Sequence, residues 1–320
     1  MDILKELSNI GIIPVVKIND AKKAMPLAKA LAAGGLAAAE ITFRTDAAED
    51  AIREISTACP DMLVGAGTVL TIDQAQRAMN AGAKFIVSPG FNPKVVKWCL
   101  DNGITPLPGC TTPSEIEGAL ELGLKVVKFF PAEQSGGLAK IKAMSAPYGG
   151  IKFMPTGGVS LDNVNDYLND KCIIACGGSF MVKESYIDND NWDEITKLTR
   201  QSVEKMLGLE VGHIGINHEN EAEARATADM LSVLTGKEIE RDGEKSMFVT
   251  SEFELMKSKG PGKCGHIAIL ANNVERAIYH LSKRGIKFNE DSATFNPDGS
   301  RKFIYLAEEF GGFGIHLIQK

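Results

Sequence analysis

The strongest constraint on the fold is a regular alternation of apolar and alanine-rich segments from residue 12 to about residue 180. The apolar segments are short and rich in β-branched residues, and the stretches between them have helical periodicity. This pattern is typical of β-α units that build a parallel sheet. Eight segments are expected to be strands: Ile12–Val16, Ala37–Phe43, Leu63–Val69, Phe85–Ser88, Ile104–Leu107, Val126–Phe130, Ile151–Pro155 and Ile173–Ala175.

Eight strands with helices between them predict an α/β fold, a (β/α)8 TIM barrel. Helices are expected over Ala21–Ala33, Ile72–Ala81 and Pro113–Leu122. In such barrels the active site forms at the carboxyl ends of the strands, and inward-facing side chains alternate along each strand. Functional side chains are therefore expected at or just after the strand ends.

One lysine, Lys128, lies inside the apolar segment Val126–Phe130. Burial disfavours the ammonium form and lowers a lysine pKa, which makes the amine a nucleophile able to form a Schiff base with a carbonyl group. The alternative is a snorkelling or salt-bridged lysine at a strand end. Alternation places Glu40, Thr42 and Arg44 on one face of the second strand and Lys128 on one face of the sixth. If both faces point inward, a carboxylate, a guanidinium and an amine share one cavity.

The pattern changes after an expected helix over Trp192–Met206 and a short link at residues 208–210. An internal repeat of about fifty residues follows, which predicts two βαβββ modules facing one another in a smaller α+β domain. We therefore expect two domains, residues 1–208 and 211–320. The repeated pieces are Gly212–Ile216 with Gly265–Ile269, and Phe253–Lys257 with Ile315–Lys320; the expected helices are Glu221–Leu234 and Val274–Arg284.

Charge and cysteine usage limit the possible partners and location. The formal net charge of −6 argues against binding to nucleic acid or a membrane surface, because no basic excess is present to neutralise phosphates. No apolar run approaches the roughly 20 residues of a spanning helix, and the first residues lack a basic-then-apolar leader. Six cysteines without a Cys-x-x-Cys pair fit reduced thiols. These features predict a cytoplasmic protein.

Seven motifs in the first 208 residues, in this order, resemble the 2-keto-3-deoxy-6-phosphogluconate (KDPG) and 4-hydroxy-2-oxoglutarate (KHG) aldolase family. Any single motif is weak, but the ordered series is specific. The resemblance implies a class I aldolase without a metal cofactor, and a trimer. The motifs are Glu40–Thr45, Gly65–Thr68, Ser88–Gly90, Pro108–Glu115, Lys128–Glu133, Pro155–Gly158 and Gly177–Ser179.

The resemblance assigns roles to particular residues. Lys128 would form the Schiff base, and Glu40 would be the general acid and base. Glu40 has an alternative role as a structural partner that keeps Lys128 charged. Arg44 suits a substrate carboxylate. The remaining expected contacts are Thr68, Pro89, Phe130 and Thr156 for the substrate, and Gly157, Gly158, Gly177, Gly178 and Ser179 for a phosphate.

Position 17 departs from the family pattern. Many members have arginine after the first strand, whereas this chain has Lys17. Lysine keeps the positive charge but lacks the planar fork of a guanidinium. A binding role is therefore not carried over to Lys17.

The repeat in residues 211–320 resembles the vicinal oxygen chelate superfamily, which includes glyoxalase I. In that fold the first and last strand of each module supply metal ligands, which implies His213, Glu254, His266 and His316 here. Three imidazoles and one carboxylate suit a divalent metal of unknown identity. Isolated strand histidines are more often simply packed residues, and a degenerate ligand-sensing module is the alternative. His218 and His280 lie off the matched positions and are expected at the surface.

The leading hypothesis is a lyase that reversibly cleaves KDPG, 4-hydroxy-2-oxoglutarate or both to pyruvate plus glyceraldehyde 3-phosphate or glyoxylate. Its partners would be a small keto acid or phospho sugar acid, and further copies of the chain. One alternative keeps the barrel as a non-catalytic domain that binds phosphorylated ligands. The other makes the metal module the main enzyme, a lyase, isomerase or dioxygenase.

Overall fold

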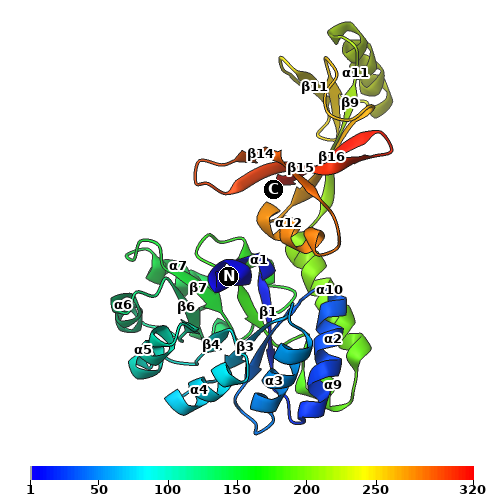
Figure 1. Ribbon diagram of the computed structural model, residues 1–320. Helices are drawn as coiled ribbons and strands as arrows, with labels where there is room; N and C mark the ends of the chain where they lie inside the picture. Colours follow the sequence, from blue (N-terminus) through cyan, green and yellow to red (C-terminus); the bar gives the residue numbers. More distant parts are fainter. Residues whose placement is uncertain (1) are drawn as a thin grey trace. The chain divides into compact units, whose positions relative to one another are not determined.

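The computed structural model describes residues 2–320. The chain forms two units, Met1–Met206 and Leu207–Lys320, each held together by its own contacts (Figure 1). Among residues 2–320, no helix combines the length and the apolar character needed to cross a membrane.

The first unit has eight parallel strands whose pairing follows the chain. Strands β1 to β5 pair in order and β8 pairs back to β1, while β6 and β7 pair with each other. Isolated parallel bridges join Gly109 to Lys128, Phe153 to Ile173 and Thr156 to Gly177. The predicted α/β class is confirmed. The strands are β1 (Ile12–Val16), β2 (Ala38–Thr42), β3 (Leu63–Gly67), β4 (Phe85–Val87), β5 (Thr105–Leu107), β6 (Val126–Phe129), β7 (Lys152–Pro155) and β8 (Cys176–Gly178).

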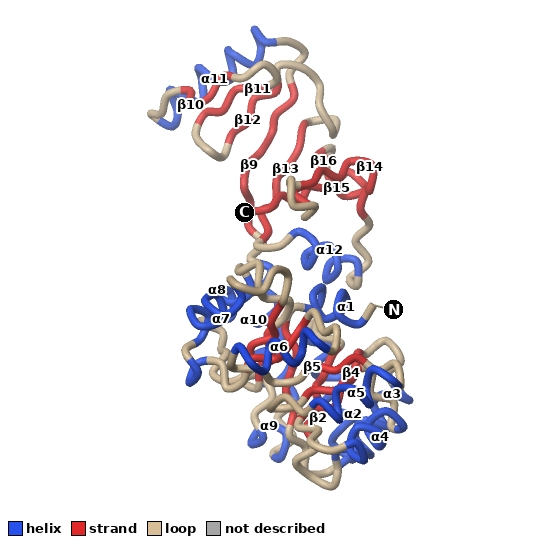
Figure 2. Tube along the Cα trace, turned by 90° about the vertical axis from the view of Figure 1, so that its left-hand side faces the viewer, coloured by secondary structure: helices blue, strands red, loops and turns tan. Residues whose placement is uncertain are grey.

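Helices surround these strands (Figure 2), and local sequence explains where several of them begin. Thr112 and Glu115 form a capping box before α6, with Pro113 at the first helical position. Asn92 caps α5 by accepting a hydrogen bond from the Lys94 amide. The helices are α1 (Ile3–Ile10), α2 (Ala24–Gly34), α3 (Ala48–Ala58), α4 (Ile72–Asn80), α5 (Pro93–Asp101), α6 (Pro113–Glu121), α7 (Gly137–Ser145), α8 (Val164–Leu168), α9 (Glu184–Asp188) and α10 (Trp192–Leu207), with 3₁₀ turns Ala21–Lys23 and Glu133–Ser135.

The eighth strand is not where its apolar segment predicted it. The expected segment Ile173–Ala175 contributes only a single bridge, from Ile173 to Phe153. The ladder with β1 instead uses Cys176–Gly178, in which Cys176 is opposite Ile12. A strand is defined by its pairing partner, and β1 reaches only residues 176–178. The glycine pair expected to follow the strand is therefore part of it.

The second unit is mostly sheet. Its elements run strand, helix and three strands, and then repeat that order. One mixed sheet contains all eight strands in the order β10-β11-β12-β9-β13-β16-β15-β14. The bounds are β9 (Glu210–Asn217), α11 (Glu221–Thr235), β10 (Ile239–Asp242), β11 (Ser246–Val249), β12 (Phe253–Met256), β13 (Gly265–Ala271), α12 (Val274–Ser282), β14 (Phe288–Phe295), β15 (Arg301–Phe310) and β16 (Phe313–Gln319).

The strands that begin the two copies of this element order, β9 and β13, are antiparallel neighbours in the middle of the sheet. Strand β12 pairs in parallel with β9, and β16 pairs in parallel with β13. On one side of the sheet, Ala224 and Ala228 of α11 pack against Met247, Val249 and Leu255. Alternation then places the side chains of the neighbouring positions, including Phe248 and Glu254, on the other face.

Candidate functional site

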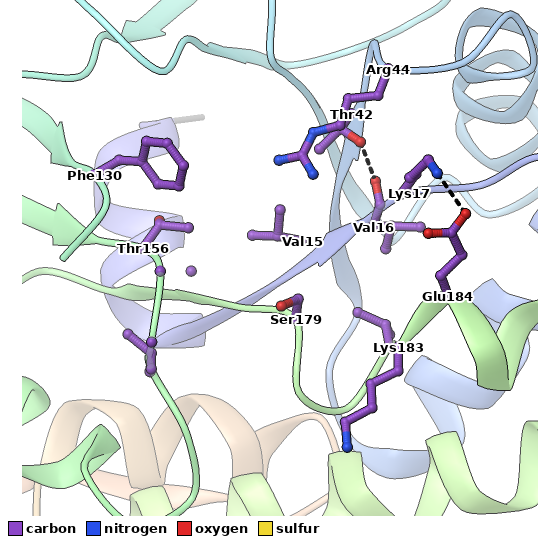
Figure 3. Close-up of a pocket in the computed structure, with 15 residues that line it drawn as sticks. Val15, Val16, Lys17, Thr42, Arg44, Phe130, Thr156, Ser179, Lys183 and Glu184 are labelled. Atoms are coloured by element: carbon purple, nitrogen blue, oxygen red, sulfur yellow. Dashed lines mark hydrogen bonds and ion pairs between the residues drawn. The ribbon is translucent and has the colours of Figure 1, made fainter. Parts of the chain in front are cut away.

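A cavity of about 300 Å³ opens where strands β1, β2, β6, β7 and β8 of the first unit end (Figure 3). Parallel strands of a barrel present the residues after their carboxyl ends to one common space. Seven of the expected site residues line it: Arg44, Phe130, Thr156, Gly157, Gly158, Gly177 and Ser179. The expected residues Glu40, Thr68, Pro89, Lys128 and Gly178 are not among the lining residues.

Lys128 and Glu40 meet in the interior of the first unit. The Lys128 Nζ lies 3.2 Å from the Glu40 Oε1, and the two residues are 5% and 0% exposed. Lys128 Nζ is also 5.3 Å from the centroid of the Phe130 ring, which lines the cavity. The other carboxylate oxygen of Glu40, Oε2, is buried and has no hydrogen-bond partner among residues 2–320. A buried amine, a carboxylate and a free acceptor atom therefore lie next to the cavity.

A glycine makes room for this pair. A Cβ atom at Gly67 would lie 2.2 Å from the Glu40 Oε1, far inside van der Waals contact. Because β3 is the neighbour of β2, with Gly65 opposite Glu40 in the ladder, any side chain at residue 67 would displace the carboxylate. Glycine is therefore required at position 67 of the motif Gly65–Thr68, because any larger residue would collide with Glu40.

Arg44 follows β2 and its guanidinium points into the cavity (Figure 3). Its Nε donates a hydrogen bond of 3.4 Å to the Thr68 hydroxyl. Thr68 has a φ of 56°, an uncommon conformation for a β-branched residue that marks local strain. Thr42, on the same face of β2, uses its hydroxyl to donate to the Val16 carbonyl at 2.8 Å. Arg44 is therefore held with its fork available, which suits a carboxylate.

The turn after β7 lines the cavity with backbone. Gly157 and Gly158 have φ values of 100° and 79°, which only glycine adopts readily. Asn163 holds this turn by donating from Nδ2 to the Gly158 carbonyl at 3.0 Å. Thr156, 6% exposed, has a buried hydroxyl without a hydrogen-bond partner among residues 2–320. A Cβ at Gly177 would lie 2.3 Å from that hydroxyl oxygen, so glycine is required there as well.

Pro89 and Gly178, two of the five expected residues that do not line the cavity, have close neighbours of their own. The Pro89 carbonyl lies against Gly109, where an added Cβ would meet it at 2.0 Å. At Gly178 an added Cβ would meet the Phe180 ring at 2.9 Å. The cavity also contains charged residues to which the sequence assigned no role, Lys183 and Glu184, with Lys17 beside them. The signal that could have found Lys183 and Glu184 is a charged pair at the start of the helix that follows the eighth strand.

Three of the four expected metal ligands converge in the second unit. The Nε2 atoms of His213 and His266 lie 3.1 Å apart, and each is close to Glu254 Oε2, at 3.2 and 3.0 Å. Their ligand atoms all fall within 4.8 Å of one another. Ser246 donates a 2.6 Å hydrogen bond to the other oxygen of Glu254, which orients the carboxylate. Burial opposes ionisation of Glu254, but hydrogen bonds with His213, His266 and Ser246 together lower its pKa well below its usual range.

His316 lies beside this group but is not part of it. Its ring centroid is 5.2 Å from that of His266 and 5.6 Å from that of His213. It packs against Phe303, with ring centroids 4.4 Å apart. Burial, with the neighbouring His266 and His213, lowers the pKa of His316 to about 3. The expectation that His280 is a surface residue is wrong, because His280 is only 3% exposed.

The spacing of the three ligand atoms fits a metal ion. Nitrogen and oxygen ligands bind zinc at about 2.0–2.2 Å with tetrahedral geometry, so neighbouring ligand atoms around such an ion are about 3.4 Å apart. The three mutual distances of 3.0, 3.1 and 3.2 Å are somewhat shorter than this value, and a small outward movement of the side chains would accommodate the ion. The other ring nitrogen of His266, Nδ1, is buried and lacks a hydrogen-bond partner among residues 2–320, whereas metal-ligating histidines usually have one there.

Comparisons with known proteins identify the first unit. The profile of the KDPG and KHG aldolase family matches residues 3–198. The 2-dehydro-3-deoxy-phosphogluconate aldolase of Haemophilus influenzae is 48% identical over 202 residues, which cover 63% of this chain and 95% of that protein. The KHG/KDPG aldolase of Escherichia coli K12 is 42% identical over 193 residues, 60% of this chain and 91% of that protein.

Solved structures of KDPG aldolases are also similar to the first unit. The KDPG aldolase of Legionella pneumophila, with pyruvate captured as a covalent carbinolamine, has a TM-score of 0.60 and 37% identity, and the match covers 62% of this chain and 96% of that chain. The aldolase of Zymomonas mobilis with 3-phosphoglycerate has a TM-score of 0.59 and 36% identity, over 62% of this chain and 94% of that one. The expectation of an aldehyde-lyase is confirmed, and the chain belongs to the KDPG and KHG aldolase family.

Proposed function

We propose that the first unit is a class I aldolase that reversibly cleaves KDPG, and also 4-hydroxy-2-oxoglutarate, to pyruvate plus glyceraldehyde 3-phosphate or glyoxylate. The observation that carries this proposal is the buried pair of Lys128 and Glu40, 3.2 Å apart, next to a cavity that contains Arg44. The relatives named for KDPG cleavage, and the one with pyruvate bound covalently, support the same reaction.

The chemistry starts at the neutral amine of Lys128, which attacks the keto carbon of the substrate and forms a carbinolamine. Loss of water gives a protonated imine, which acts as the electron sink. The carbon–carbon bond then breaks, its electron pair moves into an enamine, and the proton of the substrate hydroxyl goes to Glu40 as the aldehyde leaves. The enamine carbon takes a proton back, and water releases pyruvate from Lys128. Glu40 suits the proton transfers because its Oε2 has no partner within residues 2–320.

The cavity lining is assigned to the two ends of the substrate. Arg44 would bind the carboxylate through its planar fork, with Thr68 holding the guanidinium. We also assign contacts with the substrate to Thr156, Phe130 and Pro89. The phosphate is assigned to the backbone around Gly157, Gly158, Gly177, Gly178 and Ser179, because glycine lets amide groups approach an anion closely.

The proposal extends to the context of the enzyme. We assign a (β/α)8 barrel to residues 1–208, a homotrimer as implied by the family resemblance, and a cytoplasmic location. None of the cysteines among residues 2–320 forms a disulfide, which fits a reducing compartment. Light scattering of the purified protein would test the trimer.

Borohydride trapping tests the Schiff base. Pyruvate and borohydride should add one reduced pyruvyl group to the wild-type chain at Lys128, and none to Lys128→Ala, as read by mass spectrometry. Pyruvate release from KDPG and from 4-hydroxy-2-oxoglutarate should be lost in Lys128→Ala and should survive EDTA. Wild-type protein that is not trapped, under conditions that trap a known class I aldolase, would overturn the proposal.

A second candidate function belongs to residues 211–320. We propose that His213, Glu254 and His266 hold a divalent metal, in a domain of two βαβββ modules of the vicinal oxygen chelate type, with His316 nearby. The observation in favour is the mutual spacing of the three ligand atoms. When bound, such a metal polarises a substrate oxygen as a Lewis acid. A lyase, isomerase or dioxygenase reaction there is the alternative main activity of the chain.

Calorimetric titration with zinc tests this site without any assumption about its substrate. Wild-type protein should bind one zinc ion per chain and His266→Ala should not. His218→Ala is the matched control, because His218 contacts Thr227 and the Met256 carbonyl instead of the cluster. Equal zinc binding by wild type and His266→Ala would exclude the site.

A further inference from the structure

The rim of the first unit's cavity holds an ion pair that no role assigned above explains. Lys17 follows β1, and its Nζ lies 2.6 Å from Oε1 of Glu184, the first residue of α9 (Figure 3). Asn19 donates a second hydrogen bond to the same oxygen at 2.8 Å. Both side chains are partly exposed, 37% for Lys17 and 43% for Glu184. Glu184 therefore holds the Lys17 ammonium at the cavity rim.

Glu184 is the single carboxylate among the described residues that line this cavity. The other charged residues there are cations, Lys17, Arg44 and Lys183. Lys183 runs away from the cavity centre in Figure 3, and its Nζ faces the Tyr186 ring at 5.5 Å from the centroid. The charges that an anion entering the cavity would meet are thus those of Arg44, Lys17 and Glu184.

Glu184 is also close to the residues expected to bind the phosphate. It lies five residues after Ser179, which lines the same cavity as Gly157 and Gly158. The hydrogen bonds from Lys17 and Asn19 lower the pKa of Glu184, so it stays ionised in neutral and mildly acidic solution. A negative charge next to an expected anion site costs binding energy unless it serves another purpose.

We propose that Glu184 is a specificity-determining residue for the aldolase reaction, acting as a counter-ion that neutralises Lys17 and so limits the affinity of the cavity for the phosphorylated end of the substrate. This inference rests on the proposed aldolase function. It explains how the cavity can accept both a phosphorylated and a non-phosphorylated keto acid, because the rim gives the phosphate little extra attraction.

The effect belongs to binding and not to the chemical step. The phosphate is remote from the bond that breaks, so an interaction with it acts equally on the ground state and the transition state. Replacing Glu184 should therefore change KM and leave kcat nearly unchanged. Since the pair is partly exposed, salt should screen the effect, and the Debye length falls from about 10 Å at 0.1 M to about 3 Å at 1 M.

The experiment compares wild type, Glu184→Gln, Lys17→Met and the double variant on KDPG and 4-hydroxy-2-oxoglutarate. Glu184→Gln should lower KM for KDPG about two- to fivefold at low ionic strength. The change should be smaller for 4-hydroxy-2-oxoglutarate, which lacks a phosphate. In the Lys17→Met background the same replacement should have less effect, because the cation that it frees is gone. Asp188→Asn is the matched control, since Asp188 lies on α9 with Glu184 and contacts Asn19 but not Lys17.

Calorimetric binding of glycerol 3-phosphate to the same variants measures the charge effect without turnover. Tighter binding by Glu184→Gln than by wild type supports the proposal. Equal binding, or an unchanged KM for KDPG, overturns it and leaves Glu184 without influence on the phosphate. Weaker binding, or a higher KM, also overturns it and makes Glu184 a residue that orients Lys17 toward the substrate. A wild-type chain that binds the phosphate but releases no pyruvate contradicts the aldolase function, and the calorimetry then still decides the role of Glu184.

Discussion

The Lys128 amine and the Glu40 carboxylate lie 3.2 Å apart in the first unit, although 88 residues separate them in the chain. Neither side chain is appreciably exposed. A buried pair of this kind is costly to desolvate and is often retained for function. The Phe130 ring, whose centroid is 5.3 Å from the Lys128 Nζ, lines the cavity and so connects the pair to it.

Replacing Glu40 with glutamine tests whether Glu40 transfers protons in the reaction or only packs beside Lys128. The amide keeps the shape of the side chain but cannot accept and return a proton, so kcat for KDPG cleavage should fall about 10²- to 10⁴-fold. Glu49→Gln is the control, because Glu49 forms exposed ion pairs with Arg53 and Arg77. Circular dichroism checks that the variant folds. A folded Glu40→Gln enzyme with kcat close to wild type would make Glu40 a structural partner only.

The steric role of Gly67 gives a second test. Gly67→Ala adds a methyl group 2.2 Å from the Glu40 Oε1 and must displace the carboxylate. Misplacing a catalytic group by about 1 Å can cost about 10²-fold in rate, so we expect a loss of kcat of that order. Gly90→Ala is the matched control, since a Cβ there has no atom within 4 Å. Similar activity of the two alanine variants would contradict the positioning of Glu40 by β3.

The hydroxyl of Ser246 should strengthen metal binding in the second unit. It donates a 2.6 Å hydrogen bond to Oε1 of Glu254 and thereby orients Oε2, which faces His213 and His266. Removing such an outer hydrogen bond typically weakens metal binding by about 10- to 100-fold. Zinc calorimetry on Ser246→Ala should show this loss, while Ser300→Ala, in the exposed turn between β14 and β15, should bind like wild type. Unchanged affinity in Ser246→Ala would mean that Glu254 is held by other contacts.

Two buried thiols should make the first unit less stable at alkaline pH. Burial raises the pKa of Cys99 to about 11 and, with the nearby Glu115, that of Cys110 to about 12, from 9.0. Above pH 9 the unfolded chain loses these protons while the folded chain keeps them. The free energy of unfolding should therefore fall as the pH rises from 9 toward 11 and 12, by about 1 kcal/mol per thiol at pH 10.

Urea unfolding followed by tryptophan fluorescence measures this slope, because Trp98 and Trp192 both lie in the first unit. Cys110→Ser should show a shallower decrease between pH 8 and 10 than wild type, whatever its stability at pH 8. Cys264→Ser is the control, since Cys264 is exposed. The same slope in all three proteins would contradict the assigned protonation of the buried thiols.

The sequence by itself determined the local elements, because strand and helix formation depends on nearby residues. The apolar segment Ile12–Val16 is a strand with the predicted bounds. The helix at Pro113 begins at its capping box, which is a contact between residues three apart. The motif order also identified the family, and strand alternation predicted that Glu40 and Lys128 share one cavity if both strand faces point inward.

Only the tertiary structure decided which of these residues meet. The eighth strand is Cys176–Gly178 because β1 supplies its hydrogen-bond partners, and no local pattern at residue 173 could show this. Glu184 lies 167 positions from Lys17, so their ion pair leaves no trace in sequence spacing. His316 occupies a repeat-equivalent position, yet its ring packs against Phe303 beside the three converging ligands. Distances between strands arise from how the sheet folds in space, and short-range sequence patterns do not contain them.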